Sequence, residues 1–297
     1  IDTLPYELLH DIVDKLSCRK DLFQIRSLNK TFCAVATPHL FQQITVKNTL
    51  MSAAGFSEIL QRDMVTQFII AINFHEVPKV PVKSHIGDVE VVLVSLASSF
   101  ARIHELPNLK FLTLSFPCLT GNLTSMEPLR LQRTILSVLS SRSSLPSVTS
   151  VNIIGMTALY HPVYDLPSFG SPFGSLTSLS IGAAVSHDLA EPQFQDPFIK
   201  FWEETFQHRM LGSVSHSLTS LKLSSGSFVG VVPRLDFSQA NFPALEPLSL
   251  KRILFNMDTH IEDFIVRHKG TLRTLWLMDC KIAILGSFEE PEGAPHR

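Results

Sequence analysis

Catalytic motifs are the residue patterns that would reveal a chemistry most directly, and this 297-residue sequence contains none of the common ones. It lacks GxSxG, which places a serine nucleophile on a sharp turn, and it lacks GxxxxGK and a strand-linked GxGxxG, which hold phosphates. None of its twelve histidines lies four residues from another, which excludes a zinc site with two histidines on one helix face. Its 27 acidic residues include no pair that spacing alone assigns to acid–base catalysis. The sequence therefore predicts no catalytic residue and no cofactor.

The densest polar cluster consists of Asp258, His260, Glu262 and Asp263. These residue types ligate metals, but acidic side chains at the start of a helix also interact favourably with the helix dipole while they remain solvated. We interpret the cluster as such a helix start and expect no metal site. Binding of other proteins is the function that remains, with an enzyme of unrecognised motif as the alternative.

Composition and charge exclude several classes of partner. The chain has 25 basic and 27 acidic residues and no basic run, so neither nucleic acid nor an anionic membrane surface is expected as a partner. An uncharged apolar stretch at 91–101 is too short to cross a membrane. The four cysteines lie far apart without a CxxC pair, which suits reduced thiols in the cytoplasm or nucleus. The sequence does not begin with Met, and we expect it to be a fragment of a longer chain.

The first 44 residues predict three short helices. Pro5 and Glu7 are favoured in the first turn of a helix, and Leu8, Ile12 and Leu16 follow at four-residue intervals as an apolar stripe. A second helix carries Leu22, Ile25 and Leu28 on one face. A third, shorter helix carries Phe32, Val35 and Ala36 and is expected to stop before Pro38. Such short helices cannot bury all these side chains among themselves, so another surface must cover the rest.

The pattern of this stretch is Leu4-Pro5-x-Glu7-Leu8-Leu9-x-x-Ile12-Val13-x-x-Leu16, followed by Asp21-Leu22-x-x-Ile25-x-x-Leu28-Asn29-Lys30-Thr31-Phe32. With it the chain resembles an F-box, although Phe32 lies where the family often has Trp. In that family the module binds a Skp-type adaptor and, through it, a cullin-RING ubiquitin ligase. The resemblance implies adaptor contacts from ten residues: Leu4, Pro5, Leu8, Leu9, Ile12, Leu16, Leu22, Ile25, Leu28 and Phe32. A helical cap on the following domain is the alternative.

One apolar spacing then recurs along the chain in eight copies: Phe41-x-x-Ile44-x-Val46, Val65-x-x-Phe68-x-Ile70, Leu109-x-x-Leu112-x-Leu114, Val148-x-x-Val151-x-Ile153, Leu176-x-x-Leu179-x-Ile181, Leu218-x-x-Leu221-x-Leu223, Leu245-x-x-Leu248-x-Leu250 and Leu272-x-x-Leu275-x-Leu277. The last two apolar residues of each copy lie on one side of a strand, and Leu275, for example, is expected to face a continuous core. The last three copies are 27 residues apart, within the about 20–29 of leucine-rich repeats. One copy cannot bury its own apolar face, so we expect the copies to stack as parallel strands.

Segments between the copies have helical spacing of apolar residues, at 52–62, 86–104, 128–139, 196–210 and 260–268. In the fourth segment Asp196 and Pro197 are expected to cap and open the helix. The region thus resembles the leucine-rich repeats that follow an F-box in a large fungal group of F-box proteins. Only Cys280 matches the family's Asn or Cys three residues after the last strand leucine, so we expect irregular turns. A non-repeat α/β domain is the alternative.

The expected fold class is therefore α/β, in three parts. A three-helix F-box module at 1–44 precedes an irregular leucine-rich-repeat arc at 45–285, with parallel strands and helices on the outer side, and a flexible tail at 286–297. The resemblance implies a substrate-recognition subunit of an SCF-type ubiquitin ligase, in the ubiquitin conjugation pathway. An interaction scaffold that does not engage a cullin complex is the alternative.

A target protein, whose identity the sequence does not give, is expected on the outward side of the strands. The outward row consists of the residues between the last two apolar positions of the copies: Thr113, Asn152, Ser180, Lys222, Ser249 and Trp276. Among them Thr113, Lys222 and Trp276 are the expected target contacts. For Trp276 the reason is that large aromatic residues are enriched at binding hot spots. A tail around Phe288 that covers Trp276 is the alternative.

Overall fold

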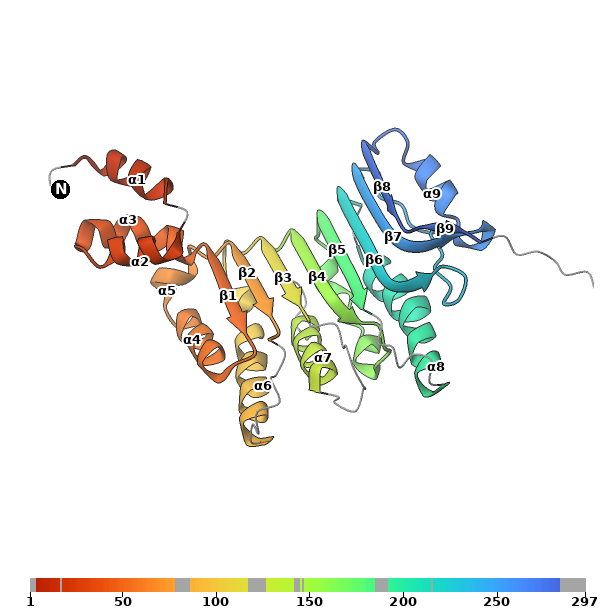
Figure 1. The fold of residues 1–297 in the computed structure, drawn as a ribbon, viewed down its shortest axis with the longest axis horizontal. Helices are drawn as coiled ribbons and strands as arrows, with labels where there is room; N and C mark the ends of the chain where they lie inside the picture. The colour runs from red at the N-terminus through yellow and green to blue at the C-terminus, as the bar shows by residue number, and fades with distance from the viewer. Residues whose placement is uncertain are drawn as a thin grey trace, which may run out of the picture.

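The computed structural model describes residues 4–16, 18–77, 86–116, 127–141, 145, 147–184, 192–214 and 216–283. Within them the chain forms a mixed α/β fold on one nine-stranded sheet in which every strand pairing is parallel. Strands β1 to β8 lie side by side in chain order, and β9 pairs with β7 (Figure 1). The expected α/β class is confirmed. In this described part no helix combines the length and the apolar character that a membrane span requires.

The strands are β1 (Gln43–Lys47), β2 (Ala71–His75), β3 (Phe111–Ser115), β4 (Ser150–Thr157), β5 (Ser178–Ala184), β6 (Ser220–Val229), β7 (Pro247–Phe255), β8 (Thr274–Met278) and β9 (Lys281–Ile282). The α-helices are α1 (Tyr6–Asp14), α2 (Arg19–Arg26), α3 (Lys30–Phe41), α4 (Leu50–Leu60), α5 (Asp63–Thr66), α6 (Ile86–Phe100), α7 (Glu127–Ser140), α8 (Pro192–Lys200) and α9 (Ile261–Arg267). The chain also forms a π-helix (Phe201–Leu211) and short 3-10 turns. The tail expected at 286–297 lies outside the described residues.

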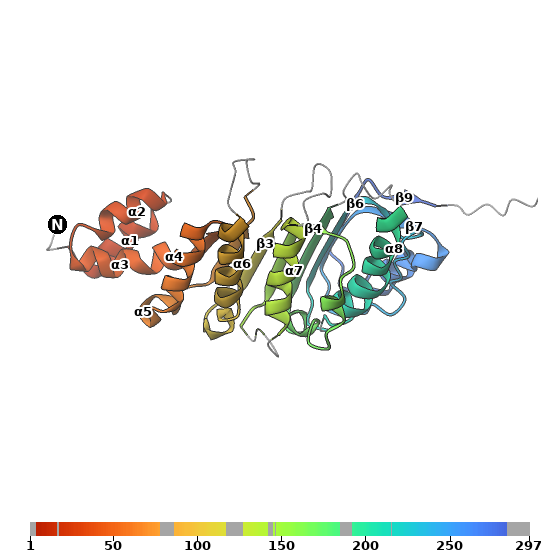
Figure 2. The same cartoon turned by 90° about the horizontal axis from the view of Figure 1, so that it is seen from below.

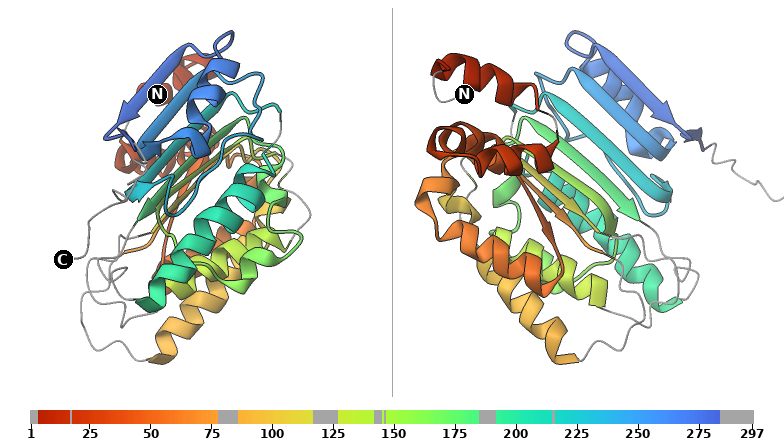
Figure 3. Two further views of the ribbon diagram at one scale, coloured as in Figure 1. Left: turned by 90° about the vertical axis from the view of Figure 1, so that its right-hand side faces the viewer. Right: turned by 60° about the vertical axis from the view of Figure 1, so that its left-hand side comes forward.

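The molecule has two layers beside a small helical module. Helices α4, α6, α7 and α8 lie side by side against one face of the sheet (Figure 2), and the view along the row of strands shows the helical layer on one side (Figure 3). Helices α1 to α3 form a separate group at the β1 end of the sheet (Figure 1). The opposite face of the sheet carries no helix among the residues that the structure describes.

The core follows from the period of two along each strand. The parallel register aligns one apolar side chain from every strand from β1 to β7 in a single buried row: Ile44, Ile72, Leu112, Val151, Leu179, Leu221 and Leu248. A second row two residues further on is also buried, for example at Val46, Leu114 and Leu250. Because the helices cover this face, both rows are removed from water, which provides the main driving force for the stacked arrangement.

The predicted strand around Val65, Phe68 and Ile70 is wrong by four residues. Val65 instead belongs to α5, and the strand β2 that follows directs Ile72 and Phe74 into the core. Two apolar triplets with the same spacing overlap in this segment, and the sequence alone does not choose between them. Pairing with β1 decides between the two triplets. In the observed register Ile72 and Phe74 lie opposite Ile44 and Val46, and all four side chains are buried.

The third helix is longer than predicted. Helix α3 does not stop before Pro38 but continues to Phe41, and the amide of Gln42 donates to the carbonyl of Pro38 at 2.9 Å. A proline inside a helix removes one hydrogen bond and crowds the preceding turn. Here that cost is offset by burial, since Leu40 lies in the core of the helical module and Phe41 packs against both this core and the core of the sheet.

The helix predicted to open at Asp196 and Pro197 begins earlier, at Pro192, and contains Pro197 in its interior. From Phe201 onward the hydrogen-bond pattern is that of a π-helix, a rare form in proteins. The carbonyl of Pro197 accepts a hydrogen bond from the amide of Tyr160 at 2.8 Å, so the connection after β4 is attached near this change of pattern. The wider turn buries Trp202, Phe206 and Met210, as the apolar spacing predicted.

The ends of several strands are irregular, as expected. The register shifts between β4 and β5 near Gly155, which has a positive φ of 69° that suits glycine. Strand β6 extends to Val229, through a run of serine and glycine residues that are common in turns. The Cys280 thiol lies 3.5 Å from the carbonyl oxygen of Leu250 on the neighbouring part of the sheet.

Burial of His161, in the segment between β4 and β5, makes the stability of the fold depend on pH. Burial lowers the pKa of His161, with a smaller contribution from the charge of Arg133, and the Nδ1 atom of His161 accepts a hydrogen bond from the amide of Val163 at 3.2 Å. The folded state therefore favours neutral His161, and its stabilisation is complete above the unfolded-state pKa of about 6.5 and is lost as the pH falls through the lower folded-state value. We expect His161→Asn, which keeps an acceptor for this cap, to reduce the drop in melting temperature between about pH 7 and pH 5. An unchanged drop would contradict this assignment.

Candidate functional surfaces

The N-terminal helical module has a small core of its own. Seven side chains from the three helices form it: Leu9, Val13, Leu22, Phe32, Val35, Ala36 and Leu40. The side-chain oxygen of Asn29 caps α3 by accepting a hydrogen bond from the amide of Phe32 at 2.9 Å, which fixes the start of that helix. The module is thus held together internally and does not depend on its whole apolar surface for folding.

A substantial apolar surface remains exposed on this module. The side chains of Leu8 and Ile12 on α1 are 48% and 44% exposed, and Leu4, just before the helix, lies on the same four-residue step. Such side chains add nothing to the core of the module in this position. A continuous apolar stripe left in solvent on a surface helix is the usual sign of a protein-binding face.

The ten residues expected to contact an adaptor thus divide by burial. Leu4, Pro5, Leu8, Ile12 and Leu28 are exposed, and Leu16 and Ile25 are half-buried against the module core. Leu9, Leu22 and Phe32 are buried in that core, so their expected role changes from contact to internal support. Two exposed aromatic side chains of the same module, Tyr6 and Phe23, were not predicted, although they lie between the apolar residues that carried the pattern.

The helix-free face of the sheet carries the predicted outward row. The parallel register aligns Thr45, Asn73, Thr113, Asn152, Ser180, Lys222, Ser249 and Trp276 across eight strands. Of the three expected target contacts, Thr113 is half-buried, Lys222 is exposed and Trp276 is 56% exposed. The alternative of a cover around Phe288 lies outside the described residues.

Two further rows of outward side chains flank this row, and the three rows together give the face a positive charge. One row begins at Gln43 and includes Phe111, and the other begins at Lys47 and includes Ile154 and Lys251. Within the three rows of strands β1 to β8 the charged residues are Lys47, Lys222 and Lys251, and no Asp or Glu is present. The two outer rows were not predicted from the sequence, although the same alternation of side chains along the strands would have identified them.

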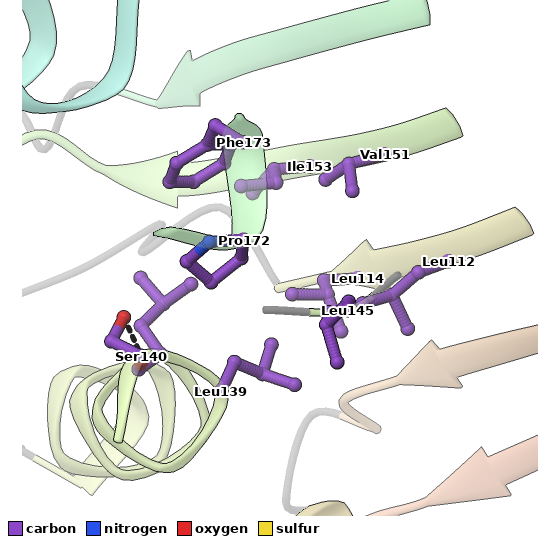
Figure 4. A pocket seen from close by; sticks show the side chains of 10 residues that line it. Leu112, Leu114, Leu139, Ser140, Leu145, Val151, Ile153, Pro172 and Phe173 are labelled. Atoms are coloured by element: carbon purple, nitrogen blue, oxygen red, sulfur yellow. Dashed lines mark hydrogen bonds between the residues drawn. The ribbon is translucent and has the colours of Figure 1, made fainter. Parts of the chain in front are cut away.

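Apart from these surfaces, the described residues form a small pocket and a polar cluster. The small pocket between α7 and the sheet is lined mainly by leucine, isoleucine and valine side chains and also by Ser140, with Phe173 and Pro172 closing one side (Figure 4). Its space of about 10 Å³ holds no more than one water molecule. In the cluster around Asp258, the Nδ1 atom of His260 lies 3.3 Å from Oδ2 of Asp263. Among the described residues, three ligand-type side chains come within reach of one ion only at a different place, between α1 and α3.

Comparison with known proteins adds no identification. No family model and no curated protein matches this sequence. The structure offers two candidate binding surfaces: an exposed apolar face on an internally stable helical module, and a helix-free, positively charged face on a parallel sheet.

Proposed function

We propose that this chain is a substrate-recognition subunit of an SCF-type ubiquitin ligase. The helical module acts as an F-box that binds a Skp-type adaptor and, through it, a cullin complex, and the sheet acts as a leucine-rich-repeat arc that binds a target protein. The subunit itself breaks and forms no bonds. It accelerates ubiquitin transfer by holding a lysine of the target near a conjugating enzyme that the rest of the complex supplies.

The observation that carries this proposal is that the apolar side chains of α1 are divided between the core of the module and its surface. Leu9 and Val13 close the core of the module, whereas Leu8 and Ile12 remain on its surface. A simple helical cap on the sheet would direct its apolar residues toward the sheet, and such a stripe left in solvent would serve no purpose. Among the described residues of this module, Phe41 packs against both cores. The exposed stripe therefore favours a module built to bind a second protein.

The target-binding part of the proposal is supported by the helix-free face. Parallel strands in register present their outward side chains in rows, which form an extended surface for an unfolded segment or a flat partner. Because the three rows contain Lys47, Lys222 and Lys251 without any carboxylate, they favour an acidic or uncharged segment over a basic one. Trp276 and Phe111 supply exposed aromatic area at two places on this face.

Reconstitution tests the ligase assignment. The purified chain is mixed with a Skp-type adaptor and a cullin–RING pair, and the assembly is followed by size-exclusion chromatography with light scattering. Co-elution of all components supports the proposal. Co-elution with the adaptor but not with the cullin would indicate the scaffold alternative, and failure to bind the adaptor would refute the F-box assignment.

Reversal of charge on the helix-free face tests target binding. A photoreactive residue at position 276 captures partners in cells, and we expect Lys222→Glu combined with Lys251→Glu to reduce a specific capture by about tenfold or more, because attraction becomes repulsion. Lys269→Glu, beyond α9 and outside the three rows, is the matched control and should leave capture unchanged. Equal capture by all variants would remove this face from target recognition.

A further inference from the structure

Two histidines and one aspartate meet between the first and third helices. His10 and Asp14 lie one turn apart on α1, and His39 lies in the last turn of α3. The Nδ1 atom of His10 is 3.6 Å from Oδ2 of Asp14, and the Nε2 atom of His39 is 3.4 Å from Oδ1 of the same carboxylate. One ligand atom from each of the three residues lies within 4.8 Å of the others.

These separations fit the coordination shell of a small cation. Bonds of about 2.0–2.1 Å at tetrahedral angles place two zinc ligands roughly 3.3 Å apart, close to both of these distances. The Nε2 atom of His39 is shielded from solvent and makes no hydrogen bond within the described structure, although it faces Asp14. A nitrogen in this position gains a partner when a cation lies between the three side chains.

The chemistry of the ligands selects the type of ion. Calcium and magnesium prefer six or more oxygen ligands, whereas imidazole suits zinc and its neighbours among the divalent transition metals. We propose that His10, Asp14 and His39 form a binding site for a divalent transition-metal ion, with Zn²⁺ as the best fit. Three protein ligands leave the fourth tetrahedral position to water, because His10 and Asp14 are both partly exposed to solvent.

Such an ion would connect α1 to α3 by coordination bonds. Helix α1 has nine residues, of which only Leu9 and Val13 are fully buried, so its attachment to the module depends on little apolar contact. Binding of an ion to the folded arrangement and not to the unfolded chain stabilises that arrangement. Zn²⁺ therefore holds the exposed face of α1 in a fixed orientation. This role concerns the module itself and does not depend on the identity of any partner.

An ordinary ion pair, in which the carboxylate of Asp14 lies between two imidazoles, is the competing explanation. It requires no metal and predicts no specific zinc affinity. Another His–Asp pair on this chain serves as a comparison: His260 and Asp263 lie 3.3 Å apart at the start of α9, with no third ligand within reach in the described structure. A site made by all three residues should differ from this pair in zinc binding.

Calorimetric titration of the untagged, chelator-treated full chain with Zn²⁺ tests the proposal. We expect one ion per chain, an affinity at least about tenfold weaker in each of His10→Gln, Asp14→Asn and His39→Gln, and no change in His260→Gln. The ion should also raise the melting temperature of the wild type but not of Asp14→Asn. Because His10 and Asp14 are partly exposed, their variants should keep the wild-type circular dichroism even if His39→Gln unfolds the module. Absence of zinc binding, or an affinity unchanged in His10→Gln and Asp14→Asn, would overturn the proposal.

Discussion

Replacement of Leu8 and Ile12 together by Asp is expected to abolish recovery of a Skp-type adaptor with this chain. Both side chains are close to half exposed, so a partner can remove their remaining apolar surface from water, worth about 1 kcal/mol or more for each. The two Asp residues must in addition give up hydration at the interface without an opposite charge. The sum exceeds about 4 kcal/mol, which corresponds to about a thousandfold in Kd.

A matched control variant separates loss of adaptor binding from loss of the folded structure. Met51→Asp combined with Met64→Asp introduces the same charges at exposed apolar residues of α4 and α5, outside the helical module, and should leave adaptor recovery unchanged. The thermal transition of the sheet should persist in both double variants, because none of the four residues contributes to its core. Adaptor recovery equal to that of the wild type in the Leu8/Ile12 variant would contradict the proposed binding face.

For most strands, the side chains that face the core could be predicted, because this choice depends on local rules. In seven of the eight copies, the two apolar residues two positions apart lie on the strand where the sequence placed them. Side chains along a strand alternate between faces, so a pair such as Leu112 and Leu114 fixes which face is buried without reference to the rest of the chain. The outward row followed from the same alternation, and the register places Trp276 beside Ser249 in that row.

Three failures occurred where a local pattern competed with tertiary contacts. The segment 65–74 offers two apolar triplets of one spacing, and only pairing with β1 selects Ile72 and Phe74. Pro38 favours a helix stop and Pro197 a helix start, but both lie inside helices. For Pro38, burial of the later Leu40 outweighs one lost hydrogen bond. Tertiary contacts decided these cases, and a single sequence does not contain them.

The functional surfaces were predictable to different degrees. The stripe on α1 was predicted as one broad face, but its division into Leu9 and Val13 inside and Leu8 and Ile12 outside depends on how α1 packs on α3. The same packing brings His39 to Asp14, so this cluster could not be read from spacing along the chain. Only the one-turn separation of His10 and Asp14 was visible in the sequence.

Leu248→Ala is expected to reduce the free energy of unfolding by about 2–5 kcal/mol, the usual result for a buried leucine. Leu248 of β7 is fully buried in the core of the sheet, and the helical layer prevents water from filling the space that Ala would leave. Its partner in the parallel register, Leu275 of β8, provides a matched comparison on the neighbouring strand. Chemical denaturation of the two variants measures both values under one condition.

Leu275→Ala should cost clearly less, about 1 kcal/mol or below, because surface substitutions remove little buried area. The expectation that Leu275 faces a continuous core is wrong for the described residues: its side chain is 39% exposed and that of Leu277 is 48% exposed. Strand β8 is the last on the path from β1, so its apolar side lacks the cover that a further strand and helix would give. Equal losses for Leu248→Ala and Leu275→Ala would mean that Leu275 is covered in solution by a part of the chain beyond the described residues or by a second molecule.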